Sequence, residues 1–169
     1  MAQRAAAVNK TLLIVFFSRT NGTRQMAEAA AAVNEPGVAI RLLTAEQATA
    51  DDLLRADGVI FATPETLAAI AGPMKDFFDR AYYPALGGIE GRPYAIMICA
   101  GSDGANACRQ IQRIATGWRL RLIAPPLIVC TRAQTPDAIL APKQIGLADL
   151  ARCAELGAGF AAGIAAGVF

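Results

Sequence analysis

Apolar runs alternate with amphipathic segments along the chain. Residues 11–17 (TLLIVFF) are continuously apolar and partly β-branched, a pattern typical of a parallel strand that is buried on both faces. Residues 21–33 carry helix formers whose apolar positions share one face, and Pro36 and Gly37 end this segment. The chain is therefore predicted to begin with a strand and a crossover helix.

The same alternation repeats along the rest of the sequence. Further strands are predicted at residues 38–43, 58–62, 94–99 and 120–130, and further helices at residues 51–55, 69–82, 105–118 and from about 145 onward. Five strands that alternate with helices indicate an α/β fold, a doubly wound five-stranded parallel sheet with helices on both faces. Pro125 and Pro126 interrupt the fifth strand and indicate an edge position, because proline has no N–H to donate to a neighbour. We therefore expect the strand order 2-1-3-4-5.

A chain of 169 residues has the size of one ordinary α/β domain. We expect a single domain over residues 1–169, with the Ala-rich residues 1–10 as a loose N-terminal arm. Residues 131–144 form a long, proline-bearing connection beside the expected site, which we interpret as a surface excursion, with a functional lid as the open alternative; no catalytic residue is predicted there. Gly159, Gly163 and Gly167 form a stripe in the last helix that fits a seam between two copies or, as we favour, close packing within the chain.

Composition argues against several classes of function. Sixteen Lys and Arg residues oppose fourteen Asp and Glu residues without any basic run, so no nucleic acid partner is expected. The chain has no histidine and its four cysteines lack C-x-x-C spacing, which argues against a metal site and against histidine-dependent catalysis. Residues 156–169 are apolar but shorter than the roughly 20 residues of a membrane span, and residues 1–10 lack a signal-peptide pattern. We therefore expect a cytoplasmic protein with reduced cysteines and no membrane partner.

The candidate site lies in three loops, because ligands of such sheets bind beyond the carboxyl ends of strands one, three and four. The first loop opens directly into a helix and contains Ser18, Arg19, Thr20, Asn21, Gly22 and Thr23. Its hydroxyls and the N–H groups of a helix N-terminus can surround a phosphate. The segment is neither G-x-x-x-x-G-K-[ST] nor G-x-G-x-x-G, which leaves a mononucleotide phosphate. An ordinary strand-to-helix turn with Ser or Thr capping is the open alternative.

The loop after the fourth strand consists of small residues, namely Gly101, Ser102, Asp103 and Gly104. Such a loop lets a backbone approach a planar ring closely and offers N–H donors to its carbonyl edge. A plain tight turn capped by Ser102 or Asp103 explains the same residues.

The first loop resembles that of the flavodoxin-like superfamily, especially of flavodoxins, WrbA-type quinone reductases and NAD(P)H-dependent FMN reductases. The loop commonly reads S-x-T-G-x-T in that superfamily, and Ser18, Thr20 and Thr23 fall on its hydroxyl positions. Asn21 stands where glycine is usual, and Asn is well suited among non-glycine residues to a left-handed backbone. The resemblance implies a flavodoxin-like fold.

Residues 62–80 resemble the WrbA-type segment G-T-P-x-Y/F-F-G-N-M-S-G-Q-M-K-x-F-L-D-R without insertion or deletion. In that family the part before the helix touches the flavin ring through an aromatic residue, a glycine and an asparagine. The corresponding positions here hold Thr66 or Leu67, Ala68 and Ala69. The resemblance therefore implies a flavin site without the usual aromatic contact.

The implied cofactor is FMN. Its phosphate would be held by the first loop, its pyrimidine edge would face Gly101 to Gly104, and its ring and ribityl chain would be bordered by the loop that contains Thr63, Pro64, Glu65, Thr66 and Leu67. The implied activity is an oxidoreductase reaction in which NAD(P)H delivers hydride through the flavin to a small acceptor such as a flavin or a quinone. A non-enzymatic flavodoxin-type electron carrier and a degenerate domain that binds another phosphorylated ligand are the alternatives. Because such reductases commonly pair, a homodimer or higher oligomer is expected.

Overall fold

The computed structural model describes residues 9–169. The strands are β1 (Lys10–Phe16), β2 (Val38–Thr44), β3 (Gly58–Thr66), β4 (Ala69–Ile70), β5 (Pro93–Ala100), β6 (Arg121–Leu122) and β7 (Leu127–Cys130). The helices are α1 (Gly22–Ala31), α2 (Ala50–Arg55), α3 (Gly72–Ala85), α4 (Ala105–Gly117), α5 (Pro136–Leu140) and α6 (Leu147–Ala166). Residues 1–8 of the expected arm lie outside the described residues, and Lys10 already belongs to β1.

The strands form one parallel sheet in the order β2-β1-β3-β5, and β6 and β7 both pair with β5 at the far edge. The short β4 adds an antiparallel extension to β3. The predicted order 2-1-3-4-5 is confirmed, with β5 as the fourth predicted strand and the β6–β7 pair as the fifth. The fifth strand is broken between Leu122 and Leu127, where Pro125 and Pro126 remove two backbone donors.

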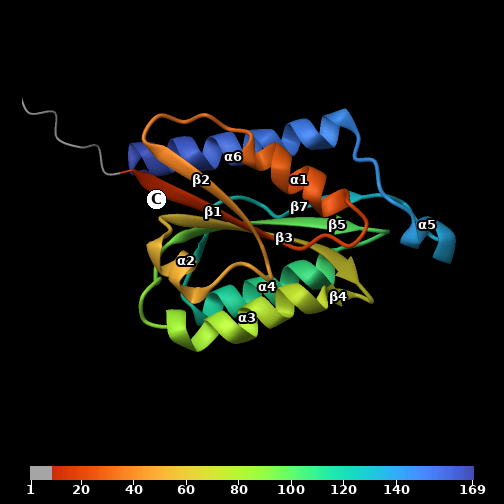
Figure 1. Cartoon of the computed structure of the whole chain (residues 1–169), viewed down its shortest axis with the longest axis horizontal. Helices are drawn as coiled ribbons and strands as arrows, with labels where there is room; N and C mark the ends of the chain where they lie inside the picture. The colour runs from red at the N-terminus through yellow and green to blue at the C-terminus, as the bar shows by residue number, and fades with distance from the viewer. Residues whose placement is uncertain (1–8) are drawn as a thin grey trace, which may run out of the picture.

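Alternating side chains of the central strands divide the core into two layers. Leu12 and Ile14 of β1 face α1 and α6, whereas Leu13 and Val15 face α2, α3 and α4. Figure 1 shows α1 and α6 along one face of the sheet and α3 and α4 along the other. The second layer holds most of the aromatic side chains, with Trp118 packed among them. Helices on both faces were predicted and are confirmed.

The helix predicted from residue 69 begins three residues later than expected. Leu67 and Ala68 have φ values of 51° and 59° and turn the chain back into β4. Pro73 lies in the first turn of α3, where a missing N–H costs no intrahelical hydrogen bond, so the helix begins at Gly72 after the β4 strand. Residues 65–70 are therefore a hairpin at the carboxyl end of the sheet.

The close approach of α6 to the rest of the chain involves a glycine outside the predicted stripe. A Cβ atom at Gly157 would overlap the backbone carbonyl of Ala30 in α1. Gly159 faces open space, and Gly163 is covered by the ring of Phe169 from the same chain. Among residues 9–169, no helix is both long and apolar enough to cross a bilayer.

Candidate cofactor-binding site

The loop between β1 and α1 contains two buried hydroxyl groups that bond to nothing. Ser18 Oγ and Thr23 Oγ1 are buried and have no hydrogen-bond partner. A buried hydroxyl without a partner is unfavourable and rare, so each is a donor available to a ligand. Asn21 has a φ of 69° and turns the loop into α1, which has no acidic residue in its first turn. The loop therefore fits an anion such as a phosphate, which the positive end of the helix dipole also favours.

A segment between β7 and α6 (residues 131–145, called the strap below) holds this loop in place. The Gln25 side chain donates to the carbonyls of Asn21 (3.0 Å) and Lys143 (2.8 Å) and accepts from the N–H of Ile145 (3.1 Å). The Lys143 N–H donates to the carbonyl of Thr20 at 2.7 Å. The loop of residues 18–23, called the phosphate loop below, and the strap are therefore joined by hydrogen bonds, although they are far apart in sequence.

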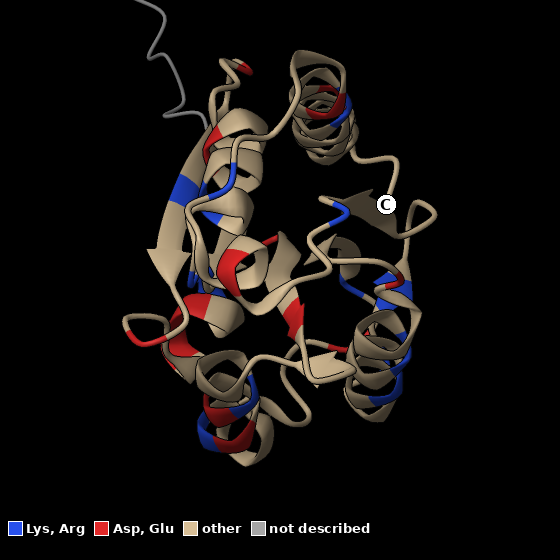
Figure 2. Cartoon of the chain, turned by 90° about the vertical axis from the view of Figure 1, so that its right-hand side faces the viewer, with Lys and Arg blue, Asp and Glu red and all other residues tan. Residues whose placement is uncertain are grey.

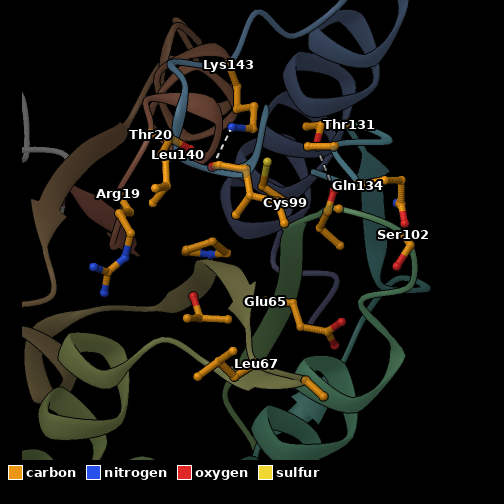
Figure 3. Close-up of a pocket in the computed structure, with 17 residues that line it drawn as sticks. Arg19, Thr20, Glu65, Leu67, Cys99, Ser102, Thr131, Gln134, Leu140 and Lys143 are labelled. Atoms are coloured by element: carbon orange, nitrogen blue, oxygen red, sulfur yellow. Dashed lines mark hydrogen bonds between the residues drawn. The ribbon is translucent and has the colours of Figure 1, made fainter. Parts of the chain in front are cut away.

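A pocket of about 340 Å³ opens beside this loop, at the carboxyl ends of β1, β3 and β5 (Figure 3). This volume lies at the lower end of the range of small-molecule sites. Charged residues of both signs occur around this edge of the molecule (Figure 2). The pocket itself is lined by three charged residues, Arg19, Glu65 and Lys143, and otherwise by small, polar and aliphatic ones.

The structure brings the three predicted loops together around this pocket. The predicted residues that line it are Arg19, Thr20, Pro64, Glu65, Thr66, Leu67, Gly101 and Ser102. Ser18, Asn21, Gly22 and Thr23 complete the adjacent loop at the start of α1. Gly22 allows close packing there, because a Cβ atom would lie 2.7 Å from Cys99 Sγ and force that side chain to shift.

Other predicted residues are engaged within the chain. Thr63 is fully buried, and its hydroxyl donates to the Pro64 carbonyl (3.1 Å) and accepts from the Ala71 N–H (3.4 Å). Asp103 accepts from the Ala105 N–H at 3.3 Å. These side chains hold the loops in shape and do not line the pocket.

Glu65 joins the second loop to the third. Its two carboxylate oxygens accept from the N–H groups of Gly104 (3.0 Å) and Ala107 (3.1 Å), at the N-terminus of α4. A carboxylate is stabilised there by the helix dipole. The Gly104 N–H is therefore used by Glu65, and the residues of this loop that line the pocket are Gly101 and Ser102.

Several lining residues were not predicted. They are Ala68, Cys99, Ala100, Thr131, Ala133, Gln134, Ile139, Leu140 and Lys143. Most of them belong to the connection interpreted as a surface excursion, which contains the short helix α5. The one sequence signal was the apolar pair Ile139–Leu140 within an otherwise mostly polar stretch.

Cys99 forms part of the pocket wall, and its thiol is neutral. Burial raises the pKa of Cys99 to about 11, and the Lys143 charge only partly offsets this, as does the Thr23 hydroxyl, which lies near the thiol but outside hydrogen-bonding geometry. A thiol with such a pKa is a poor nucleophile at neutral pH. Cys99 therefore shapes the pocket and supplies no reactive group.

Comparison with known proteins agrees with this geometry. Residues 44–134 match the sequence profile of the NADPH-dependent FMN reductase family. The chain belongs to this family. The resemblance stated from the sequence is thereby confirmed, as is FMN as the cofactor that goes with it. The matched residues include the second and third loops but not the phosphate loop. The assignment of that loop to a phosphate therefore depends on its geometry alone.

A flavodoxin of Aquifex aeolicus is 33% identical to the chain over an alignment of 105 positions, which covers 59% of this chain and 57% of the relative. The chain thus matches little more than half the length of this relative.

Solved structures confirm the flavodoxin-like fold. A flavodoxin from the domain Archaea superposes with a TM-score of 0.73 at 18% identity, covering 91% of this chain and 98% of its own. The WrbA-like protein of Agrobacterium tumefaciens gives 0.65 at 18% identity, covering 92% and 97%. An NADPH-quinone reductase from P. pentosaceus gives 0.61 at 20% identity, covering 88% and 97%.

Proposed function

We propose that the chain binds FMN at this pocket and catalyses hydride transfer from NAD(P)H, through the flavin, to a small acceptor such as a flavin or quinone. The observation that carries the proposal is the pair of buried, unpartnered hydroxyls of Ser18 and Thr23 at the N-terminus of α1. Together with family membership, this pair supports a site for the FMN phosphate.

In this proposal the chain supplies binding and orientation, and the bound flavin supplies the capacity to accept and pass on hydride. Ser18 and Thr23 donate to the phosphate, and Thr20 lies where the loop meets the pocket. The backbone of Gly101 and Ser102 can approach the ring closely because neither residue has a bulky side chain.

The test is a titration of the purified protein with FMN and with riboflavin, followed by addition of NADPH or NADH with a quinone acceptor. We expect FMN to bind clearly more tightly than riboflavin, because the buried donors face the phosphate, and we expect the loaded protein to oxidise NAD(P)H. Equal affinity for both flavins would place the phosphate elsewhere. Tight FMN binding without NAD(P)H oxidation would contradict the proposed reductase activity.

A non-enzymatic electron carrier is the second candidate, because the relative from Aquifex aeolicus is named a flavodoxin. A carrier would hold FMN but would accept electrons only from a separate reductase. The net charge of +2 is unlike the strongly acidic surface that suits a carrier docking on basic partners. The NAD(P)H arm of the titration separates the two functions.

We further propose that the chain forms a single domain, works in the cytosol and assembles at least into a homodimer. The four cysteines are free thiols, which suits a reducing compartment. Helix α6 presents an outer face of small residues that supports pairing.

A further inference from the structure

Helix α5 carries apolar side chains that have no core to pack against. None of its residues is buried, and Ile139 and Leu140 are 50% and 70% exposed. Both side chains nevertheless line the pocket. Figure 1 shows α5 set apart from the helices that cover the sheet, at the end of the molecule where the carboxyl ends of the strands lie.

The chain stabilises α5 at both ends even though the helix contributes nothing to the core. The Thr135 hydroxyl accepts from the Ala138 N–H at its start, and Pro136 occupies its first turn. The Lys143 ammonium donates to the carbonyls of Ala138, Ile139 and Ala141 at its end. Five residues form a stable helix in water only with such support.

Both flanks of α5 are tied to loops of the pocket. On one side, the N–H groups of Thr131 and Arg132 donate to the carbonyls of Ala100 and Gly101, both at 2.8 Å. On the other side, the Lys143 backbone is bonded to Thr20 and Gln25. The helix therefore spans the pocket from the β5 loop to the phosphate loop.

A third exposed aliphatic side chain stands opposite. Leu67, at the turn between β3 and β4, is 97% exposed and also lines the pocket. Figure 3 shows Leu140 and Leu67 on opposite sides of the cavity. Among the described residues that line the pocket, none is aromatic. Apolar contact with a planar ring can therefore come only from aliphatic groups.

We propose that Leu140 and Ile139 of α5 form one wall and Leu67 the other wall of the site for the isoalloxazine ring, in place of an aromatic platform. The inference rests on the proposed FMN function. The ring is the occupant because the pocket is continuous with the phosphate loop through Arg19 and Thr20. Burial of the ring removes the three exposed side chains from water, which is the favourable contact that the free protein lacks.

The first test compares Leu140→Gln with Leu147→Gln. Leu147 is a matched control, because it is 86% exposed at the start of α6 and does not line the pocket. We expect Leu140→Gln to weaken FMN and riboflavin by the same factor, about tenfold, because a ring contact is common to both flavins. Leu147→Gln should leave both affinities at the parent value. A loss confined to FMN would assign Leu140 to the phosphate and overturn the proposal.

The second test introduces a fluorescence quencher into the proposed wall and does not depend on a loss of affinity. A stacked indole quenches flavin emission, so Leu140→Trp should strongly reduce the fluorescence of bound FMN relative to the parent complex. Leu147→Trp should not. Unchanged emission from FMN bound to the Leu140→Trp protein would show that residue 140 does not contact the ring. It would contradict this inference but not the proposal that the chain binds FMN. A parent protein that binds neither flavin would overturn both this inference and the proposed function.

Discussion

At the scale of single residues, unfavourable features gather around the pocket. Ser18 and Thr23 each bury a hydroxyl without a partner. Leu67 and Ala68 adopt a left-handed backbone, which disfavours a side chain by about 1 kcal/mol per residue. Such features lower the stability of the free protein, and a ligand that satisfies the hydroxyls recovers part of that loss. Substitutions that remove these hydroxyls from the phosphate loop should therefore raise the stability of the free protein and weaken FMN binding.

Replacing Thr23 by Val tests this opposition. The methyl group fills the space of the hydroxyl and removes a buried donor without a partner, so the ligand-free protein should gain about 1 kcal/mol in unfolding free energy. FMN should bind about tenfold more weakly or worse, because a hydrogen bond to a charged group contributes about 1.5–3 kcal/mol. Urea unfolding and a fluorescence titration measure the two effects.

Thr116→Val is the control for that variant. The Thr116 hydroxyl is exposed on α4, where it donates to the Gln112 carbonyl at 2.8 Å, far from the phosphate loop in sequence and fold. Thr116→Val should leave the affinity for FMN and the affinity for riboflavin unchanged. If Thr23→Val lowered the stability of the free protein and kept full FMN affinity, its hydroxyl would belong to the fold and not to the ligand.

The cysteines should differ sharply in reactivity. Cys130 is exposed, whereas burial raises the pKa of Cys99, Cys108 and Cys153 to about 11. A thiol reagent at pH 8 should therefore modify one cysteine quickly and three slowly. FMN should slow the modification of Cys99 further, since that residue lines the pocket. Mass spectrometry of the modified peptides identifies each site, and rapid labelling of Cys99 would contradict its burial.

The same shifts make stability depend on alkaline pH. The folded chain retains thiol protons that the unfolded chain releases from about pH 9, so this contribution is complete below pH 9 and declines as the pH rises towards 11. Urea unfolding between pH 8 and pH 10.5 should show a falling unfolding free energy.

At the scale of elements, hydrophobic periodicity predicted the buried strands and helices. It did not predict the elements that depend on backbone conformation or that have no buried side. The runs that became β1, β3 and β5 are apolar because both faces of the sheet are covered. The β3–β4 hairpin was not predicted, because its turn uses Leu67 and Ala68 at positive φ and neither residue favours such a turn. Helix α5 was not predicted either, since five residues without a buried side show no periodicity.

The contact between α1 and α6 gives an element-scale prediction with a matched pair of variants. Gly157→Ala places a methyl group against the Ala30 carbonyl and should lower the unfolding free energy by about 2 kcal/mol or more. Gly159→Ala, two residues later in the same helix, meets open space and should raise it by about 0.5–1 kcal/mol. Thermal unfolding in dilute solution compares the two.

Because α1 carries the phosphate loop at its N-terminus, Gly157→Ala should also weaken FMN, whereas Gly159→Ala should not. Equal stabilities for the two variants would mean that α6 shifts away from α1 without loss.

At the scale of the whole molecule, the strand order explains why the location of the site could be predicted from the sequence. Once the order 2-1-3-4-5 was inferred, the loops after β1, β3 and β5 had to meet at one edge, and they do. Which side chains of those loops face the ligand was not predictable, because it depends on bonds such as that between Glu65 and Gly104. The strap of residues 131–145 is held at the pocket by tertiary contacts to Ala100 and Gly101 at one end and to Thr20 and Gln25 at the other, and no sequence motif signals such contacts.

The outer face of α6 should mediate self-association. Phe160 and Ile164 face the sheet, so the opposite side of the helix exposes small residues, namely Ala158, Ala162, Ala165 and Ala166. Small side chains let two helices approach closely, and a charge in such a seam is unfavourable. Light scattering should give the parent about twice the chain mass of 17.6 kDa, and Ala162→Arg should return it to the monomer. Ala151→Arg, exposed near Asp149 and Glu155 in the charged first half of α6, should leave the dimer intact. A monomeric parent at working concentration, or an Ala162→Arg variant that still pairs, would move the interface away from α6.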